Sequence, residues 1–362
     1  MHIKTLMLVT LISSSVSCAY ASTLLERVKW LEHATATCAD KALDHDQANG
    51  VLCEVSAVAR VGDTLIFAND KLFPGNSSSP IFTLALENNR VVDVTPDYLN
   101  APVLKQAEKF EALTTTLDGR YVIASTAFSR VGTDSDAGFD NYNTIVYWPA
   151  DAPGRVDISS LSVRQGVASS VALREQMSQA LGADFFQVEG LSVAPGNRLL
   201  VGIRKQGANR KEAREVFRIL ATTFSLDNGV LQFTSPFKLI FEFVPHHTQQ
   251  VPQDLGLSSI EFDRYNQDRI YALTSFEDEE NISGYLWSIP LRGLLEGDSL
   301  SPQLVRTEDG LPVKFLNKPE GLEVLDKSHL LIVHDDDRVQ VDASSGGIPS
   351  KVNEFAYTVV GF

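Results

Sequence analysis

The chain has 362 residues and a formal net charge of −15, with 46 acidic against 31 basic side chains. A surface of this sign repels nucleic acid and anionic lipid, so neither is an expected partner. Hydrophobic residues make up 44% of the chain, enough to bury a large core. Beyond the N-terminus, no run reaches the roughly 18 apolar residues that a membrane-spanning helix needs.

Residues 1–21 have the pattern of a signal peptide, with a positive start followed by a short apolar run. Ala19-Tyr20-Ala21 offers small residues for cleavage before Ser22. A lipoprotein modified at Cys18 is the less favoured alternative, because the three residues before this cysteine lack the usual leucine. The mature protein is therefore expected in the periplasm or outside the cell.

Removal of the leader leaves two cysteines, Cys38 and Cys53. An even pair in an oxidising compartment predicts a disulfide. Closing this loop would stabilise the fold by about 3 kcal/mol on the chain-entropy estimate. A metal site that combines the two cysteines with His33 or His45 is the alternative.

A sequence pattern of two short apolar strands joined by a tight turn occurs five times along the chain. The clearest copy is Val188–Val193 followed by Leu199–Arg204. Two similar copies begin at Glu111 and at Glu320, and weaker ones contain Ser56 and Ser258. Self-similarity of this kind indicates a strand-rich repeat architecture.

Each repeat is expected to hold up to four strands. In chain order the predicted strands are Ser56–Val58, Leu65–Phe67, Ile81–Leu86 and Val91–Val94; Glu111–Leu113, Tyr121–Ala124, Thr144–Trp148 and Arg155–Ile158; Val188–Val193, Leu199–Ile203, Val216–Leu226 and Val230–Val244; Ser258–Ile260, Ile270–Leu273, Tyr285–Ile289 and Gln303–Val305; and Glu320–Leu325, Leu330–Val333 and Phe355–Val360. Helical spacing predicts a helix over Val171–Leu181 that stops at Gly182. Composition predicts loops over Pro74–Pro80 and Ser129–Asn143.

Four strands per repeat is the count of a propeller blade, and blades must pack around an axis to bury both faces. We therefore predict an all-β, five-bladed propeller of antiparallel blades over residues 53–362, with six blades as the alternative. The last repeat is one strand short. The segment near Trp30, within an N-terminal segment of residues 22–52, would complete that blade and close the ring.

Ring closure brings equivalent positions of the blades to one end of the axis. The starts of the first strands contribute Glu111, Glu189 and Glu320, whose like charges would repel one another. Calcium takes several oxygen ligands in irregular geometry and would relieve this repulsion. Asp70, at the end of a second strand, would be a further ligand. Alternatively, the glutamates accept backbone N–H groups and hold the blades together.

Other second-strand ends suggest chemistry at the same face. Arg204 and Lys205 are candidates to grip a phosphate or carboxylate substrate, or they form a surface salt bridge. His334 is a candidate general base oriented by Asp335, or an ordinary loop histidine. The nucleophile elbow, HExxH, P-loop and dinucleotide-binding patterns are all absent from the sequence.

Two of the repeat phrases resemble a known family. Val188-Glu189-Gly190-Leu191 and Lys318-Pro319-Glu320-Gly321-Leu322, each with the strand that follows it, are similar to a family of exported bacterial propellers of unknown function. That family is close to the group labelled "esterase-like activity of phytase". The first-repeat phrase at residues 56–63 and the helix around Leu173 also resemble it, so the likeness covers roughly residues 50 to 340.

The resemblance implies calcium-dependent hydrolysis of phosphate esters at the axial face. The residues that it would assign to this activity are Glu111, Glu189, Glu320, Arg204 and Lys205. The chain departs from a regular ring of glutamates at Ser56 and Ser258, which leaves fewer carboxylates than several calcium ions would need.

The leading hypothesis is an exported propeller whose axial site holds a divalent cation or an anionic ligand, with calcium-dependent hydrolysis of phosphate or carboxylate esters as its activity. The alternative is a non-enzymatic binding or scaffold propeller that uses loops such as Ser129–Asn143 to bind a protein partner. A carbohydrate-binding or lactone-hydrolysing propeller is a third reading, because fold does not determine function. The protein is expected to be a monomer.

Overall fold

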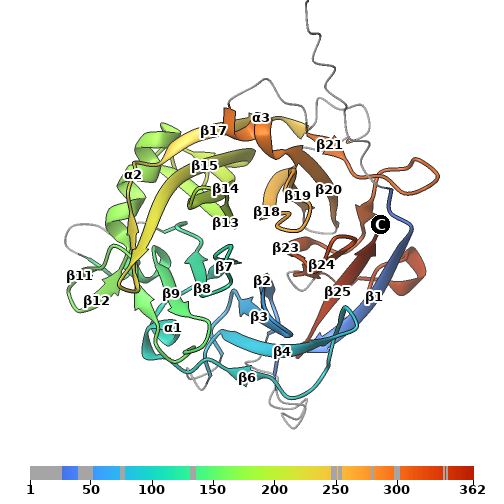
Figure 1. The fold of residues 1–362 in the computed structure, drawn as a ribbon, viewed down its shortest axis with the longest axis horizontal. Coiled ribbons are helices and arrows are strands. Elements are labelled where there is room, and N and C mark those ends of the chain that lie inside the picture. Colours follow the sequence, from blue (N-terminus) through green and yellow to red (C-terminus); the bar gives the residue numbers. More distant parts are fainter. Residues whose placement is uncertain are drawn as a thin grey trace, which may run out of the picture.

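The computed structural model describes residues 27–39, 52–73, 78–130, 136–245, 251, 255–278, 281–296, 302–336, 339 and 341–362. Within these residues, five antiparallel sheets are arranged as the blades of a propeller (Figure 1). The predicted five-bladed fold is confirmed. The signal peptide, Cys18 and His45 lie outside the described residues. None of the helices in the described ranges is long and apolar enough to cross a bilayer.

The chain builds the blades in order, each from the axis outward. The strands are β2 (Val55–Val61), β3 (Thr64–Asn69), β4 (Ile81–Glu87), β5 (Arg90–Val91) and β6 (Asp97–Tyr98) in the first blade; β7 (Phe110–Thr115), β8 (Tyr121–Thr126), β9 (Ile145–Pro149) and β10 (Asp157–Ile158) in the second; β13 (Phe185–Ala194), β14 (Arg198–Gly207), β15 (Arg214–Asp227), β16 (Val230–Phe233) and β17 (Lys238–Phe243) in the third; β18 (Gly256–Phe262), β19 (Arg269–Glu277), β20 (Ile282–Pro290), β21 (Gln303–Leu304) and β22 (Lys314–Phe315) in the fourth; and β23 (Pro319–Val324), β24 (His329–His334), β25 (Glu354–Gly361) and β1 (Trp30–Thr37) in the fifth.

Short helices and one hairpin connect the blades. They are α1 (Pro102–Gln106), the 3-10 turn η3 (Asp140–Tyr142), the hairpin β11 (Ser162–Arg164) and β12 (Val167–Ser169), α2 (Val171–Leu181), α3 (Leu291–Glu296) and the 3-10 turn η5 (Ala343–Ser345). The predicted helix over Val171–Leu181 is confirmed as α2, and it ends at Gly182, whose φ of 65° lies in the left-handed region that glycine favours.

The single outer strand predicted over Val230–Val244 is wrong, because two strands occupy this region. The 14-residue strand β15 is long enough to pair with β16 near one end and with β17 near the other. Pro236 lies between them and has no N–H to donate to a ladder. At this break the backbone N–H of Thr223 in β15 donates to the hydroxyl of Ser235 at 2.9 Å.

The ring is closed by strands from the two ends of the described chain. Strand β1 is the outermost strand of the fifth blade and pairs with β25 along its whole length, from Trp30 with Gly361 to Thr37 with Glu354 (Figure 1). The predicted closing strand near Trp30 is confirmed. Because the first strand of the chain belongs to the last blade, the ring cannot open without breaking this ladder.

Apolar side chains fill the spaces between the blades. Five hydrophobic clusters occur in the described residues, one at each junction between neighbouring blades. At the junction that closes the ring, the Phe67 ring of the first blade lies 5.0 Å, centroid to centroid, from the Phe355 ring of the fifth. Trp148 and Trp287 are fully buried at two other junctions. Blade-to-blade packing is therefore the core of the molecule.

Small residues near the axis let the first strands approach closely. A Cβ built on Gly321 would lie 3.0 Å from the Cα of Ala57 in the next blade, and one built on Gly190 would lie 3.1 Å from the backbone N of Ile260. Both distances are shorter than ordinary contacts between such atoms. The glycines after Glu189 and Glu320 are therefore required by close packing around the axis.

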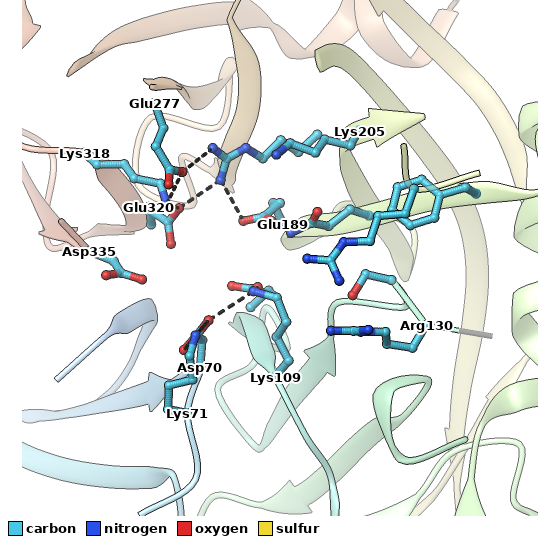
Figure 2. Close-up of a pocket in the computed structure, with 16 residues that line it drawn as sticks. Asp70, Lys71, Lys109, Arg130, Glu189, Lys205, Glu277, Lys318, Glu320 and Asp335 are labelled. Atoms are coloured by element: carbon cyan, nitrogen blue, oxygen red, sulfur yellow. Dashed lines mark hydrogen bonds and ion pairs between the residues drawn. The ribbon is translucent and has the colours of Figure 1, made fainter. Parts of the chain in front are cut away.

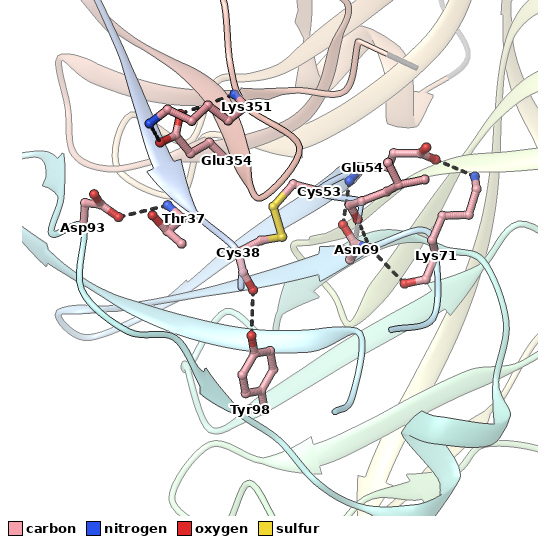
Figure 3. The surroundings of a disulfide bond; sticks show 11 residues. Thr37, Cys38, Cys53, Glu54, Asn69, Lys71, Asp93, Tyr98, Lys351 and Glu354 are labelled. Carbon is pink, nitrogen blue, oxygen red and sulfur yellow. Dashed lines mark hydrogen bonds and ion pairs between the residues drawn. A yellow bond between two sulfur atoms is a disulfide. The ribbon is translucent and has the colours of Figure 1, made fainter. Parts of the chain in front are cut away.

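The predicted disulfide between Cys38 and Cys53 is present (Figure 3). It joins the segment after β1, in the last blade, to the start of the first blade. The Cys38 carbonyl accepts a hydrogen bond from the Tyr98 hydroxyl at 2.8 Å, and the Thr37 N–H donates to Asp93 at 2.9 Å. Because the two sulfurs are bonded to each other, the alternative of a cysteine–histidine metal site is wrong.

Gly321→Val should lower the free energy of unfolding by about 1–3 kcal/mol, because the added side chain would overlap the neighbouring blade. Urea unfolding followed by circular dichroism measures the change. Gly154→Val is the matched control, since Gly154 has no atom within 4 Å of its Cβ position and no positive φ. Equal stability of the two variants would contradict close packing at Gly321.

The double variant Cys38→Ala/Cys53→Ala should be less stable than the wild type by about 3 kcal/mol, because the unfolded chain regains the freedom of the open loop. Urea unfolding with and without a reducing agent measures this difference. The reductant should destabilise the wild type and leave the double variant unchanged. If the reductant leaves the free energy of unfolding of the wild type unchanged, the disulfide does not stabilise ring closure.

Candidate functional site

The first strand of each blade contains a β-bulge at the same position. The ladder register shifts there in all five first strands that the structure describes. A bulge leaves its extra residue outside the ladder and redirects the side chain. The extra residues are Ser56, Glu111, Glu189, Ser258 and Glu320. The repeat that the sequence shows is therefore a repeat of bulges around the axis.

The two serines at this position join neighbouring blades. The Ser56 hydroxyl donates to the Phe110 carbonyl at 2.6 Å, and the Ser258 hydroxyl donates to the Pro319 carbonyl at 2.7 Å. Each acceptor directly precedes the bulged glutamate of the next blade. Serine in place of glutamate thus provides a bond between blades where the other repeats provide a charge.

The bulged glutamates lie in a cavity of about 320 Å³ at one end of the axis, called the axial cavity below (Figure 2). Its described lining includes six carboxylates and seven cations. The carboxylates are Asp70, Glu111, Glu189, Glu277, Glu320 and Asp335, the cations are Lys71, Lys109, Arg130, Arg204, Lys205, Arg210 and Lys318, and the other lining residues are Ser129, Phe185 and Gln187. Seven of the eight residues predicted for metal binding or catalysis line this cavity, and His334 does not.

Arg204 connects the carboxylates of three blades. Its Nη1 lies 3.0 Å from Glu320 and 3.8 Å from Glu189, and its other nitrogens lie within 3.6 Å of Glu215 and Glu277. Its side chain is only 4% exposed. Burial disfavours the charged form, but the four carboxylates raise the pKa of Arg204 above its ordinary value. Arg204 is therefore a fixed cation inside the network.

Two lysines that the sequence analysis missed complete the network. Lys109 contacts Asp70 at 3.0 Å and also Glu111, while Lys318 lies 3.0 Å from both Glu277 and Glu320. Each lysine stands two residues before the bulged glutamate of its own strand. The Lys-x-Glu spacing shared by two repeats is the signal from which they could have been found.

A second group of carboxylates lies beside the first. Glu54, Asp70 and Asp335 are buried, and one oxygen from each lies within 4.8 Å of the others. Lys71 contacts Glu54 at 2.6 Å and Asp70 at 2.8 Å. Burial opposes ionisation of Asp70, but the neighbouring lysines lower its pKa below the ordinary value. Lys71 and Lys109 thus offset the negative charge of Glu54 and Asp70 in this group.

Both groups of carboxylates could hold a metal ion by the spacing of their oxygens, because Glu111, Glu189 and Glu320 meet the same 4.8 Å limit. Oxygen donors of this kind suit hard cations. The lysines and Arg204, however, already supply the positive charge for which the sequence predicted calcium. They relieve only part of the repulsion between the glutamates, because burial and the neighbouring Glu189 still raise the pKa of Glu111 well above its ordinary value.

His334 lies outside the axial cavity, although Asp335 lines it. The imidazole Nε2 is 2.8 Å from the Thr358 hydroxyl, and the ring packs 5.6 Å from that of Phe315. Complete burial lowers the pKa of His334 to about 3, so the ring is neutral at neutral pH. This position gives no support to a general-base role in the axial cavity.

Arg130 and Arg210 are two further cations of the cavity. Among the described residues, no carboxylate lies within ion-pair distance of either guanidinium. Arg130 lies at the side of the cavity opposite Asp335, and its guanidinium carbon is 5.7 Å from the centre of the Phe139 ring (Figure 2). Both arginines come from loops between strands, where the repeat pattern gives no guide.

Comparison with known proteins adds only distant likenesses. No family model and no curated protein matches the chain. Among solved structures it is similar to a periplasmic gluconolactonase from Pseudomonas aeruginosa (13% identity, 82% of this chain and 85% of that one, TM-score 0.34). It is also similar to a PQQ-bound aldose sugar dehydrogenase from Streptomyces coelicolor (11%, 91% and 98%, 0.38) and to a putative glycoside hydrolase from Parabacteroides distasonis (7%, 86% and 87%, 0.44).

A second set of side chains lies three residues further along the first strands. Thr114 and Ser192 accept backbone N–H groups from the next blade at 3.3 and 2.8 Å. Glu261 and Glu323 take this position in the fourth and fifth blades, where Arg264 contacts Glu261 at 3.3 Å. Burial raises the pKa of Glu323 to about 7, although nearby arginines oppose the shift. The axis therefore holds a carboxyl group that titrates near neutrality.

Glu323→Gln should reduce the dependence of stability on pH. The pKa of Glu323 is raised from 4.5 to about 7 in the folded protein, so its contribution to stability is present below pH 4.5 and is lost as the pH rises towards 7. We expect the wild type to lose more stability than Glu323→Gln over this window in urea unfolding. Glu87→Gln, at an exposed strand end, is the control and should behave as the wild type. Parallel pH profiles for all three proteins would contradict the raised pKa.

Proposed function

We propose that the axial cavity binds a small anionic molecule, a phosphate or carboxylate ester or its product. The observation that carries this proposal is the pair Arg130 and Arg210, which line the cavity and have no carboxylate partner among the described residues. A guanidinium presents several N–H donors in a planar array that matches a carboxylate or a phosphate. Two such groups at one cavity form a site for an anion.

The charge of the cavity contrasts with that of the whole chain. The protein has a net charge of −15, whereas the described lining of the cavity has seven cations against six carboxylates. Positive groups gathered in a concave, partly buried site raise the local concentration of anions. An acidic protein with this local balance favours an anionic ligand over a metal cation.

In this proposal Arg204 and Lys205 position the site. Arg204 is occupied by four carboxylates, and Lys205 lies 3.2 Å from Glu215. They keep the carboxylates in place, while Arg130 and Arg210 contact the anion. We therefore propose Arg130 and Arg210, in place of Arg204 and Lys205, as the residues that bind the anion.

Ester hydrolysis is the reaction that we propose for this site. Burial raises the pKa of Glu189 to about 7, which suits a group that takes a proton from water at neutral pH. The hydroxide so formed would attack the acyl or phosphoryl centre, while Arg130 and Arg210 stabilise the negative charge that develops. The bond to the leaving oxygen would then break, and the proton taken up by Glu189 would pass to that oxygen, so that an alcohol departs. Asp335 lies on the side of the cavity opposite Arg130 (Figure 2).

Calcium fits the cavity in donor type but not in charge balance. Glu111, Glu189 and Glu320, with Asp70 nearby, would be its ligands, and the ion would supply Lewis-acid chemistry if it were bound. It would have to displace Lys109 from Glu111 and compete with Arg204 for Glu320. The function proposed here therefore does not depend on calcium.

We further propose that the protein is exported and works as a monomer, with cleavage before Ser22 and the propeller over residues 53–362. The disulfide between Cys38 and Cys53 supports an oxidising compartment. A top-face scaffold that binds a protein partner stays the rival function.

Isothermal titration calorimetry with inorganic phosphate tests the proposed site. We expect the wild type to bind phosphate, and Arg130→Ala and Arg210→Ala each to weaken binding about tenfold or more, because each removes a charge-assisted contact. Arg292→Ala, whose side chain is 70% exposed on α3, is the matched control and should bind as the wild type. Hydrolysis of nitrophenyl esters, with and without calcium, should be lost in Glu189→Gln. Absence of both binding and turnover would overturn the proposal and favour the scaffold.

A further inference from the structure

A second hollow, called the side groove below, adjoins the axial cavity. Its volume is about 680 Å³, and it shares four lining residues with the axial cavity, namely Ser129, Arg130, Phe185 and Arg210. Arg130 and Arg210 therefore stand where the two hollows meet. A ligand held by these arginines has access to both spaces.

The side groove differs in chemistry from the axial cavity. Phe139, Phe185, Val171 and Ala208 are its apolar lining residues, and the carboxylates Glu175 and Asp184 also line it. Phe139 is 41% exposed, a large fraction for a ring of this size. Its ring is also close to the Arg130 guanidinium, which lies 5.7 Å from the ring centre. The groove thus offers an uncovered aromatic surface beside a cation.

Buried contacts hold the wall of the side groove in place. Arg174 of α2 is 6% exposed and donates to the carbonyls of Phe128 and Asp184, the latter at 2.7 Å. Its guanidinium carbon lies 4.5 Å from the centre of the Phe186 ring. These bonds tie the segment before Arg130 to the segment that leads into β13. A wall fixed before binding reduces the entropy that a ligand must lose.

We propose that the ligand of the axial cavity is an aromatic anion, an aryl phosphate or aryl carboxylate, whose ring lies in the side groove against Phe139. This inference rests on the proposed function, because it takes the anion to be held by Arg130 and Arg210. The two hollows, at about 320 and 680 Å³, have the size of small-molecule sites. An aromatic ring stacks on phenylalanine and on guanidinium planes, and both are present here.

Calorimetric titration with inorganic phosphate and with phenyl phosphate separates the two claims. The wild type should bind phenyl phosphate about tenfold tighter than inorganic phosphate, because the ring is buried in the groove. Phe139→Ala should remove this gain, so that phenyl phosphate and inorganic phosphate bind the variant with equal affinity. Arg130→Ala should weaken both ligands. Tyr265→Ala removes another exposed aromatic ring, outside both hollows, and should behave as the wild type.

Three results would overturn the inference. If inorganic phosphate binds and phenyl phosphate gains nothing, the groove does not receive the ring, and the proposed function stands. If the gain survives in Phe139→Ala and in Phe139→Leu, the ring lies elsewhere. If neither ligand binds, the proposed function fails, and this inference fails with it.

Discussion

Mutual neutralisation of buried charge at the propeller axis is the interaction on which the site depends. An isolated charge costs several kcal/mol to bury, so each carboxylate there needs a cation and each cation needs a carboxylate. Arg204 is the cation for four carboxylates. Lys109 pairs with Asp70 and Glu111, and Lys318 pairs with Glu277 and Glu320. These cations are part of the architecture. Arg130 and Arg210 have no carboxylate partner among the described residues, and they are the cations that we propose to bind a ligand.

The fold and the site are produced by the same backbone feature. A bulge in each first strand takes one residue out of the ladder and directs it to the axis region. Where that residue is Ser56 or Ser258, it bonds the next blade. Where it is a glutamate, it contributes to the axial cavity. The bonds between blades and the axial carboxylates therefore come from equivalent positions of the five first strands.

Much of the architecture could be predicted from the sequence because it repeats. The five strand pairs predict five blades, and the missing last strand predicts closure by the segment near Trp30. Two cysteines after a predicted signal peptide predict one disulfide. The grouping of Glu111, Glu189 and Glu320 follows from the same periodicity. Each of these properties belongs to equivalent positions, which a repeat makes visible without a structure.

The partners of those glutamates could not be predicted in the same way. Lys109 and Lys318 precede the bulges, but whether a side chain reaches across the axis depends on how the blades pack. Arg130 and Arg210 come from loops that no repeat constrains. His334 ends a strand as expected, yet its ring turns into the protein, where burial lowers its pKa to about 3. Sequence periodicity places backbone positions, and packing decides which charges meet.

The central claim is that the axis holds an anion at Arg130 and Arg210 because its other cations are occupied by carboxylates. A crystal structure grown with tungstate, a phosphate analogue with strong anomalous scattering, tests this most directly. The anomalous peak should lie in the axial cavity in contact with both guanidinium groups. A cavity without tungstate, or crystals with calcium in which the metal peak lies among Glu111, Glu189 and Glu320 with Lys109 displaced, would contradict it.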